Sequence, residues 1–351
     1  MLIKKLISIG VQGRELDWFL SYLTERYQVT KVNDHHSNKA PVKFGVPQGS
    51  ILGPLLFTLY INDLPGNIRS SSSRVYLYAD DTAIFVKGKS IDVINTTLNT
   101  ELAHVSQWLQ SNYLTLNVKK TKSMLIGTHQ RLSRTQSQLN ISIRGEQLDN
   151  VDHFKYLGIW LDPSLSWSFN IDKLVSKINQ RIGLLRRVRN ILPKPTLNLL
   201  FKSLILPHFD YCDVVWGNAC TTHLSRLDKL QNTAGKVILG LPRRFPTDVL
   251  LQMLDWKKLS DRRSTHLNIL VYKSLAQKLP SNLCNIFNSV SDSHIYSTRA
   301  GSQGNLVQIL CRNNSDERKF ISRGVVTFNN LPVMAKQPLP ASVSIFKQII
   351  S

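Results

Sequence analysis

The sequence predicts an α+β fold, and three patterns of apolar residues carry this prediction. Residues 75–78 and 82–86 are two β-rich runs on either side of a bare Asp-Asp pair, which is typical of a hairpin. Apolar residues then recur at helical spacing over residues 91–114 and again over residues 171–188. Strands paired through hairpins and followed by long helices predict an antiparallel sheet with helices on one face.

The N-terminal half alternates between short strands and helices. Residues 1–30 are expected to be helical, with a break at Gly10 and Gly13. Ser50 is expected to cap an apolar helix that tolerates Pro54 in its first turn and ends at Pro65-Gly66. Further strands are predicted at residues 29–32, 42–46, 114–118, 123–126, 141–143, 147–151 and 154–161.

The chain changes character from Trp167 onwards. The apolar stripe at 171–188 is surrounded by Lys and Arg, so a basic amphipathic helix is expected there. More helices are predicted at residues 196–206, 222–239, 247–254 and 259–278, and core positions are expected for Phe209, Tyr211 and Trp216.

Composition limits the possible partners. The chain has 351 residues, is 42% hydrophobic and carries a formal net charge of +21, spread along its length. This excess favours a polyanion as partner, because Lys and Arg that neutralise phosphates release counterions, although solubility alone is the alternative. No run approaches the roughly 20 apolar residues that a membrane span needs, so no membrane partner is expected. The four cysteines form no CxxC pair, which favours reduced thiols.

Asp80 and Asp81 are the strongest candidates for chemistry. Two neighbouring carboxylates at a hairpin tip repel each other, and a divalent cation would compensate for that cost. A solvated turn without a metal is the alternative. About 30 residues upstream, the segment from Gly45 to Pro54 reads GVPQGSILGP. Two of its glycines, Gly45 and Gly49, allow the backbone to approach a ligand, with a plain strand-to-helix turn as the alternative.

Together, the two motifs resemble the palm of a reverse transcriptase from a non-LTR, LINE- or jockey-like retrotransposon. The resemblance implies RNA-templated DNA synthesis by nucleotidyl transfer, in which two Mg²⁺ ions about 3.5–4 Å apart activate the primer hydroxyl and neutralise the leaving phosphates. It implies Asp80 and Asp81 as the metal ligands. The implied template and nucleotide contacts are Pro47, Gln48, Gly49, Tyr78 and Ala79.

Three further segments extend the resemblance. The segment from Leu116 to Thr121 is similar to the next palm motif, which implies that Lys120 faces the departing pyrophosphate; a basic solvated turn is the alternative. The segment from Phe154 to Ile159 is similar to the strand pair that grips the primer. It implies that role for Tyr156, Leu157 and Gly158, which are otherwise ordinary hairpin residues.

The resemblance also implies a domain order and a set of partners. Residues 1–165 would be partial fingers and a polymerase palm-type sheet, 166–240 a helical thumb, and 241–351 a mainly helical extension of unknown role. The partners would be an RNA template, a DNA primer and deoxynucleoside triphosphates. Phosphate contacts are expected from the basic helix, at Lys173, Lys177 and Arg181.

One expected ligand is missing from the sequence. The family uses three acids, and by register the first would fall before Met1. Asp17 and Asp63 are poor substitutes, because one is expected on a solvated helix face and the other in a helix-ending turn. The chain is therefore expected to be an N-terminally truncated and inactive reverse transcriptase. A non-catalytic nucleic-acid-binding remnant, or a remnant with no function, remains as the alternative.

Overall fold

The computed structural model describes residues 1–42, 45–46, 49–135, 138–293, 296, 298–311 and 319–350. The chain forms two compact units, Met1–Asp152 and His153–Ser351. The predicted division at residues 165 and 240 stays a prediction.

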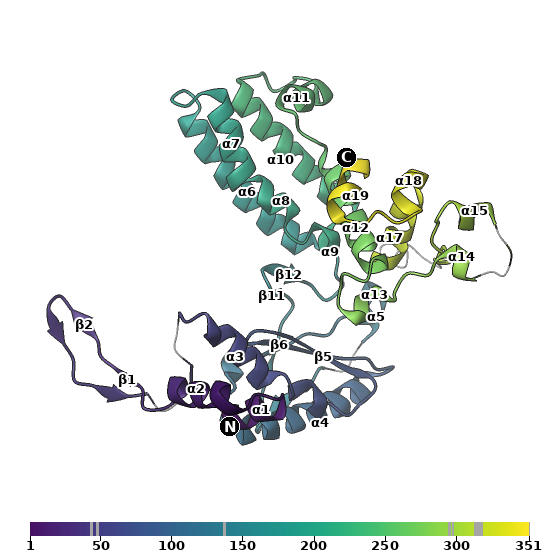
Figure 1. Cartoon of the computed structure of the whole chain (residues 1–351). Helices are drawn as coiled ribbons and strands as arrows, with labels where there is room; N and C mark the ends of the chain where they lie inside the picture. The colour runs from purple at the N-terminus through teal and green to yellow at the C-terminus, as the bar shows by residue number, and fades with distance from the viewer. Residues whose placement is uncertain are drawn as a thin grey trace. The chain divides into compact units, whose positions relative to one another are not determined.

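The first unit begins with two helices and a β-ribbon (Figure 1). Helix α1 (Leu2–Ser8) and α2 (Gly13–Leu23) are separated at Gly10, which has a positive φ of +96°, as the sequence predicts. The following ribbon pairs β1 (Tyr27–Gln28) with β4 (Ala40–Pro41) and β2 (Lys31–Val32) with β3 (His35–His36). The strand predicted at 42–46 falls in part on residues 43 and 44, which lie outside the described residues.

The centre of the first unit is one long hairpin and the helices around it. Helix α3 (Leu52–Ile61) runs into a 3-10 helix, η1 (Leu64–Asn67), and strands β5 (Ser73–Tyr78) and β6 (Asp81–Val86) follow. Helix α4 (Ile91–Ser111) is capped by the Ser90 hydroxyl, which accepts from the Val93 amide. Apolar side chains of α3, η1, β5, β6 and α4 form one core cluster, built on Ile61, Leu64, Val105 and Trp108.

The rest of the first unit is short elements. They are η2 (Val118–Lys120), β7 (Lys122–Ser123), α5 (His129–Arg134), β8 (Ser142–Ile143), β9 (Glu146–Gln147) and β10 (Asp149–Asn150). The predicted strand at 114–118 is wrong, because Leu114 and Leu116 are used as packing residues in a coil that leads into η2. Strand β7 pairs in parallel with β10.

The second unit begins with a hairpin and a helical bundle. Strands β11 (Phe154–Tyr156) and β12 (Ile159–Leu161) precede α6 (Ser168–Val188), α7 (Lys194–Leu204) and α10 (Thr221–Leu239), which run side by side (Figure 1). The short helices α8 (Leu206–Asp210) and α9 (Asp213–Trp216) form a corner between α7 and α10. Helix α6 buries Ile171, Ile178 and Ile182 at helical spacing, so the predicted apolar stripe is confirmed.

The remaining helices form a second core around α12. Helix α11 (Thr247–Leu254) packs on α10, while α12 (Leu259–Leu275) packs on α17 (Phe320–Asn329) and α19 (Val343–Ile350). The helices predicted at 196–206, 222–239, 247–254 and 259–278 are confirmed to within a few residues. The shorter helices are α13 (Ser281–Cys284), α14 (Val290–Ser293), α15 (Arg299–Ser302) and α18 (Val333–Lys336).

The α+β class is confirmed. The described residues form six two-stranded sheets, one of them parallel, together with many helices. No helix in the described ranges is both long and apolar enough to cross a membrane.

Candidate functional site

The Asp-Asp pair lies at the tip of the β5–β6 hairpin, as predicted. The register closes on the Tyr78–Asp81 pair, so Ala79 and Asp80 form a two-residue turn. Ala79 has a φ of +51°, while Asp80 keeps a negative φ. The turn therefore holds both carboxylates on a defined element rather than on a loose loop.

The two faces of this hairpin differ. Leu77 of β5 and Ile84 of β6 pack in the core cluster with Val105 and Trp108 of α4. On the opposite face, Tyr76 is 48% exposed and its ring meets Phe85 edge-on, with 5.6 Å between the ring centroids. Tyr78 is on this face too and is 65% exposed. One face thus anchors the hairpin and leaves the other open to a partner.

A buried carboxylate fixes the chain just before β5. Glu101 of α4 is 2% exposed and accepts hydrogen bonds from the amides of Ser70, at 2.7 Å, and Arg69, at 3.2 Å. Burial alone would raise the pKa of Glu101, but the two amides and the nearby His104 together lower it. Glu101 was not predicted from the sequence, since an acid on a long helix gives no local sign of burial.

The carboxylates of Asp80 and Asp81 are exposed. No Lys, Arg or His in the described part of the chain forms an ion pair with either one. Carboxylate oxygens are the donors that hard divalent cations prefer, so the two side chains fit such an ion in kind. They do not fit in number, because within the described residues no third His, Cys, Asp or Glu joins them in a ligand group.

The two other acids considered as ligands have different surroundings. Asp63 pairs with Lys5, with 2.7 Å between Oδ1 and Nζ, and precedes η1. The same Lys5 ammonium lies 4.9 Å from the Trp108 ring centroid, so Asp63 belongs to the contact that ties α1 to α3 and α4. Asp17 is exposed on α2.

The segment from Gly45 to Pro54 is described in part. Pro47 and Gln48 lie outside the described residues. Gly45 and Gly49 both have a φ of +77°, a conformation that favours glycine. The helix begins at Leu52, yet the Ser50 hydroxyl accepts from the Gly53 amide at 2.9 Å, so Ser50 helps to start the helix as predicted.

Lys120 is at the end of η2 and is exposed. Its backbone amide donates to the Asn117 side chain at 3.2 Å, which closes the turn and leaves the Lys120 ammonium free to extend into solvent. The position is compatible with an anion contact, and the role of Lys120 stays a prediction.

Tyr156, Leu157 and Gly158 form the tip of the β11–β12 hairpin. Leu157 and Gly158 are its two turn residues, with φ values of +45° and +86°. The Tyr211 hydroxyl donates to the Leu157 carbonyl at 2.6 Å. The predicted core position of Tyr211 is wrong, because this ring is 54% exposed and lies over the turn; Phe209 and Trp216 are buried as predicted.

One side of α6 is basic. The helix contains five Lys or Arg residues and one acid. Lys173 and Lys177 are exposed and Arg181 is half-buried, at steps of four residues that place them on one face. Burial lowers the pKa of His208, and so do the nearby charges of Lys177 and Arg181. This face therefore presents concentrated positive charge.

A polar cluster joins α8, α9 and α12. Ligand-type atoms of Asp210, Asp213 and His266 lie within 4.8 Å of one another. Arg262 donates to both oxygens of Asp210, at 3.0 and 2.5 Å, and the Nδ1 atom of His266 lies 2.6 Å from Asp213. The hydrogen bond to Asp213 raises the pKa of His266. Since Arg262 already pairs with Asp210 and His266 is hydrogen-bonded to Asp213, the cluster is a hydrogen-bonded network rather than a metal site.

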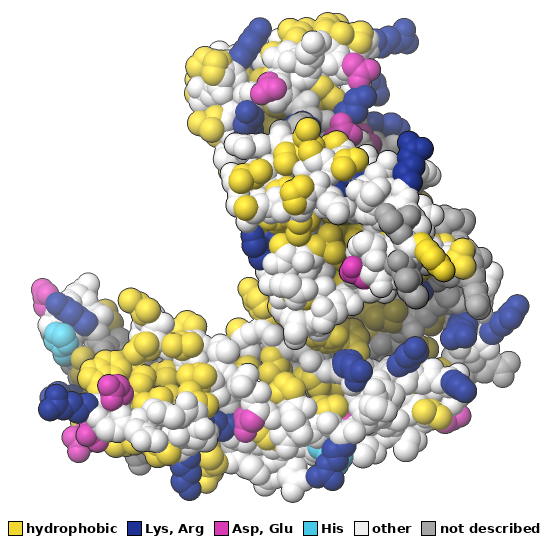
Figure 2. Space-filling view, turned by 45° about the vertical axis from the view of Figure 1, so that its right-hand side comes forward, with side chains coloured by type: hydrophobic (Ala, Val, Ile, Leu, Met, Phe, Trp, Pro, Cys, Tyr) yellow, Lys and Arg dark blue, Asp and Glu magenta, His cyan; other side chains and the backbone are white. Residues whose placement is uncertain are grey.

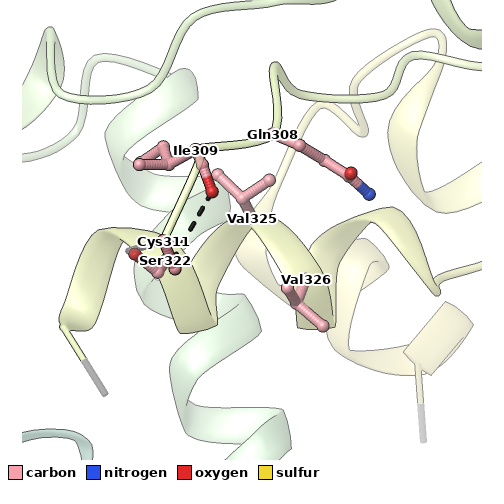
Figure 3. Close-up of a pocket in the computed structure, with 6 residues that line it drawn as sticks. All are labelled: Gln308, Ile309, Cys311, Ser322, Val325 and Val326. Carbon is pink, nitrogen blue, oxygen red and sulfur yellow. Dashed lines mark hydrogen bonds between the residues drawn. The ribbon is translucent and has the colours of Figure 1, made fainter. Parts of the chain in front are cut away.

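One small cavity lies apart from these groups. It has a volume of about 150 Å³ and is lined by Cys311 and by apolar side chains of α17 (Figure 3). The Cys311 thiol donates to the Ile309 carbonyl at 3.5 Å, and none of the described residues that line the cavity is charged.

The comparisons with known proteins concern both units. Residues 1–161 match the family model described as reverse transcriptase (RNA-dependent DNA polymerase). The chain is 29% identical over 252 residues to the RNA-directed DNA polymerase from mobile element jockey of Drosophila melanogaster. It is 29% identical over 256 residues to the probable RNA-directed DNA polymerase from transposon BS of the same species.

These alignments cover much of this chain but little of the relatives. They span 69% and 70% of this chain, and 27% and 28% of the two Drosophila proteins. A Pol polyprotein from the type-1 retrotransposable element R1 of Nasonia vitripennis is 26% identical over 220 residues, which is 60% of this chain and 65% of that protein.

Proposed function

Because this chain belongs to the reverse transcriptase family, among its LINE- and jockey-like non-LTR retrotransposon members, we propose that the β5–β6 turn is its metal-binding turn for RNA-templated DNA synthesis. The observation that carries the proposal is the placement of Asp80 and Asp81 on an exposed two-residue hairpin turn whose strands are anchored from the opposite face. Reverse transcriptases use divalent metal ions, an RNA template and nucleotide substrates, and we propose Mg²⁺ as the ion here.

The proposed reaction is nucleotidyl transfer to a DNA primer. The oxygen of the primer 3′ hydroxyl bonds to the α-phosphorus of a deoxynucleoside triphosphate, and the bond from that phosphorus to the oxygen shared with the β-phosphate breaks. The hydroxyl proton passes to solvent water, and pyrophosphate leaves. Bound Mg²⁺ would supply charge neutralisation at the attacking and leaving oxygens. Asp80 and Asp81 would hold the metal, Lys120 would face the pyrophosphate, and Tyr78, Ala79 and Gly49, together with Pro47 and Gln48, would contact template and nucleotide.

We further propose that the 351-residue chain is inactive by itself. Two carboxylates stand at the turn, and the described residues supply no third acid beside them. Loss of a metal-bridging carboxylate costs orders of magnitude in rate, because metal placement supplies much of the electrostatic stabilisation.

Metal binding is tested directly by iron-dependent cleavage. With Fe²⁺ in place of Mg²⁺ and peroxide present, hydroxyl radicals should cut the backbone around residues 78–82. Asp80→Asn and Asp81→Asn should abolish these cuts. Asp34→Asn, at a fully exposed acid in the β-ribbon, should leave them unchanged. Uniform cleavage in all variants would refute the metal assignment.

Activity is tested separately by primer extension on an RNA template with Mg²⁺. We expect no product above background from the chain alone. Efficient extension that disappears in Asp80→Asn would support the proposed metal-binding role of the turn and would refute the proposed inactivity.

A second function, non-catalytic nucleic-acid binding, is favoured by the basic face of α6. Lys173, Lys177 and Arg181 would contact successive phosphates of a nucleic-acid backbone. Each such contact releases counterions on binding, so each makes the affinity fall more steeply as the salt concentration rises. Changing all three to Ala should reduce the slope of log affinity against log salt by about 2 for single-stranded RNA. Alanine at Lys4, Lys87 and Lys347 removes the same charge elsewhere and should change the slope little. Equal slopes in both triple variants would refute a specific role of α6.

A further inference from the structure

The β11–β12 turn is braced by a side chain from another part of the second unit. The Tyr211 hydroxyl donates to the Leu157 carbonyl at 2.6 Å, across 54 residues of sequence. The Tyr211 ring also covers Gly158: a Cβ placed on Gly158 would lie 3.1 Å from the ring atom Cε1. Hydrogen bond and ring together restrain both turn residues.

This brace matters because the turn is unfavourable for its sequence. Leu157 has a φ of +45°, in a region that residues with a side chain rarely occupy. Such a conformation persists when surrounding contacts hold it in place. Tyr211 provides the contact that holds the Leu157 carbonyl.

The position of Tyr211 is itself fixed by the corner between α8 and α9. The buried Trp216 indole donates to the Tyr211 carbonyl at 2.8 Å. The neighbouring acids are held by α12, since Arg262 binds Asp210 and His266 binds the buried Asp213.

Helix α17 adds a contact to the same corner. Arg323 donates from its guanidinium to the Val214 carbonyl, in the middle of α9, at 2.7 Å. Helices from residues 241–351, whose role the sequence does not indicate, therefore hold the corner that presents Tyr211.

We infer that Tyr211 is a positioning residue for the DNA primer: it fixes the Leu157–Gly158 turn in the shape that receives the primer strand, and α12 and α17 hold Tyr211 in place. The inference rests on the proposed function and on the primer-gripping role that the family resemblance implies for Tyr156, Leu157 and Gly158. It assigns the C-terminal helices a supporting role in primer binding.

The test compares two Tyr→Phe variants that each remove one hydroxyl. Tyr211→Phe keeps the ring and removes the bond to Leu157. Tyr272→Phe is the matched control, because the Tyr272 hydroxyl also donates to a carbonyl at 2.6 Å, that of Pro340, in the core around α12. Binding is measured by fluorescence anisotropy, with a labelled RNA–DNA hybrid that has a recessed primer 3′ end and with single-stranded RNA.

We expect Tyr211→Phe to bind the hybrid about three- to tenfold more weakly, the effect of one net hydrogen bond. Its affinity for single-stranded RNA should not change, and Tyr272→Phe should match the wild type on both ligands. Equal hybrid affinity of Tyr211→Phe and wild type, or equal weakening in both variants, would overturn the inference alone. A wild-type chain that does not bind the hybrid would overturn the proposed function, and this inference with it.

Hydrogen exchange gives a second readout that needs no nucleic acid. The Gly158 and Ile159 amides should exchange faster in Tyr211→Phe and in Arg262→Gln, which releases Asp210. Arg226→Gln is the control for the arginine, because its ion pair with Asp172 joins α10 to α6. Unchanged exchange in Tyr211→Phe would show that the hydroxyl does not brace the turn.

Discussion

At Gly158, adding a single methyl group tests whether the β11–β12 turn requires a glycine. Gly158→Ala should destabilise the second unit by about 1–2 kcal/mol. A positive φ is energetically unfavourable for alanine, and the added Cβ would crowd the Tyr211 ring. Urea denaturation measures the change. Gly183→Ala is the control: Gly183 lies inside α6 with open space around it, so the same substitution should stabilise by about 0.5–1 kcal/mol. Destabilisation by both would show that backbone conformation at Gly158 is not the cause.

Glu101 gives a second prediction at this scale, with a defined pH dependence. Its pKa is lowered in the folded state, so its contribution to stability is present above the unfolded pKa of about 4.3 and is lost as pH falls through the folded value. Glu101→Gln should cost about 1.5–3 kcal/mol at pH 7, the range for hydrogen bonds to a charged group. The difference from wild type should shrink below pH 4 in denaturation curves. A pH-independent difference would contradict the role of the charge.

At the scale of elements, α12 is joined to the α8–α9 corner by charge. His266 faces Asp213 and Asp210, with Arg262 on its own helix and Arg263 and Arg323 near Asp213. Because the pKa of His266 is raised, its contribution is complete below the unfolded pKa of about 6.5 and is lost as pH rises through the folded value.

His266→Gln should therefore lower stability more at pH 6 than at pH 9. The expected loss at pH 6 is about 1 kcal/mol, a reduced value because the ring is partly exposed. Thermal denaturation at the two pH values measures it. A larger loss at pH 9 would mean that the neutral imidazole, not the imidazolium, stabilises the contact.

At the scale of the whole molecule, two units share one strongly basic chain. Lys and Arg side chains are scattered over the visible face of both units rather than gathered in one patch (Figure 2). A formal charge of +21 favours association with polyanions, but it does not itself mark a site.

Two units with separate cores should unfold separately. Calorimetry is expected to give two transitions, because chains with more than one domain do not follow two-state behaviour. Glu101→Gln should lower only one transition and Gly158→Ala only the other. A single transition, moved by both variants, would contradict independent units.

The sequence by itself determined the α+β class, the long helices and the two hairpins. Helix α6 and helix α11 follow the predicted ranges because burial of an apolar stripe at a spacing of 3.6 residues is a local pattern. The Asp80–Asp81 turn was predictable for the same reason, since alternating strands on either side of two polar residues define a hairpin. The short elements at 114–123 were predicted poorly, because a few apolar residues pack equally well from a coil.

Only the tertiary structure decided which distant side chains meet. Tyr211 and Leu157 are 54 residues apart, and Glu101 and Ser70 are 31 apart, so no periodicity in the sequence relates them. Tyr211 was expected in the core because aromatic residues at helical spacing are core residues by default, yet the αL conformation of Cys212 turns the chain at the α8–α9 corner. Such hydrogen bonds form where the packing of helices brings distant segments together. This packing depends on how many side chains fit together in the closely packed core, which no local sequence pattern specifies.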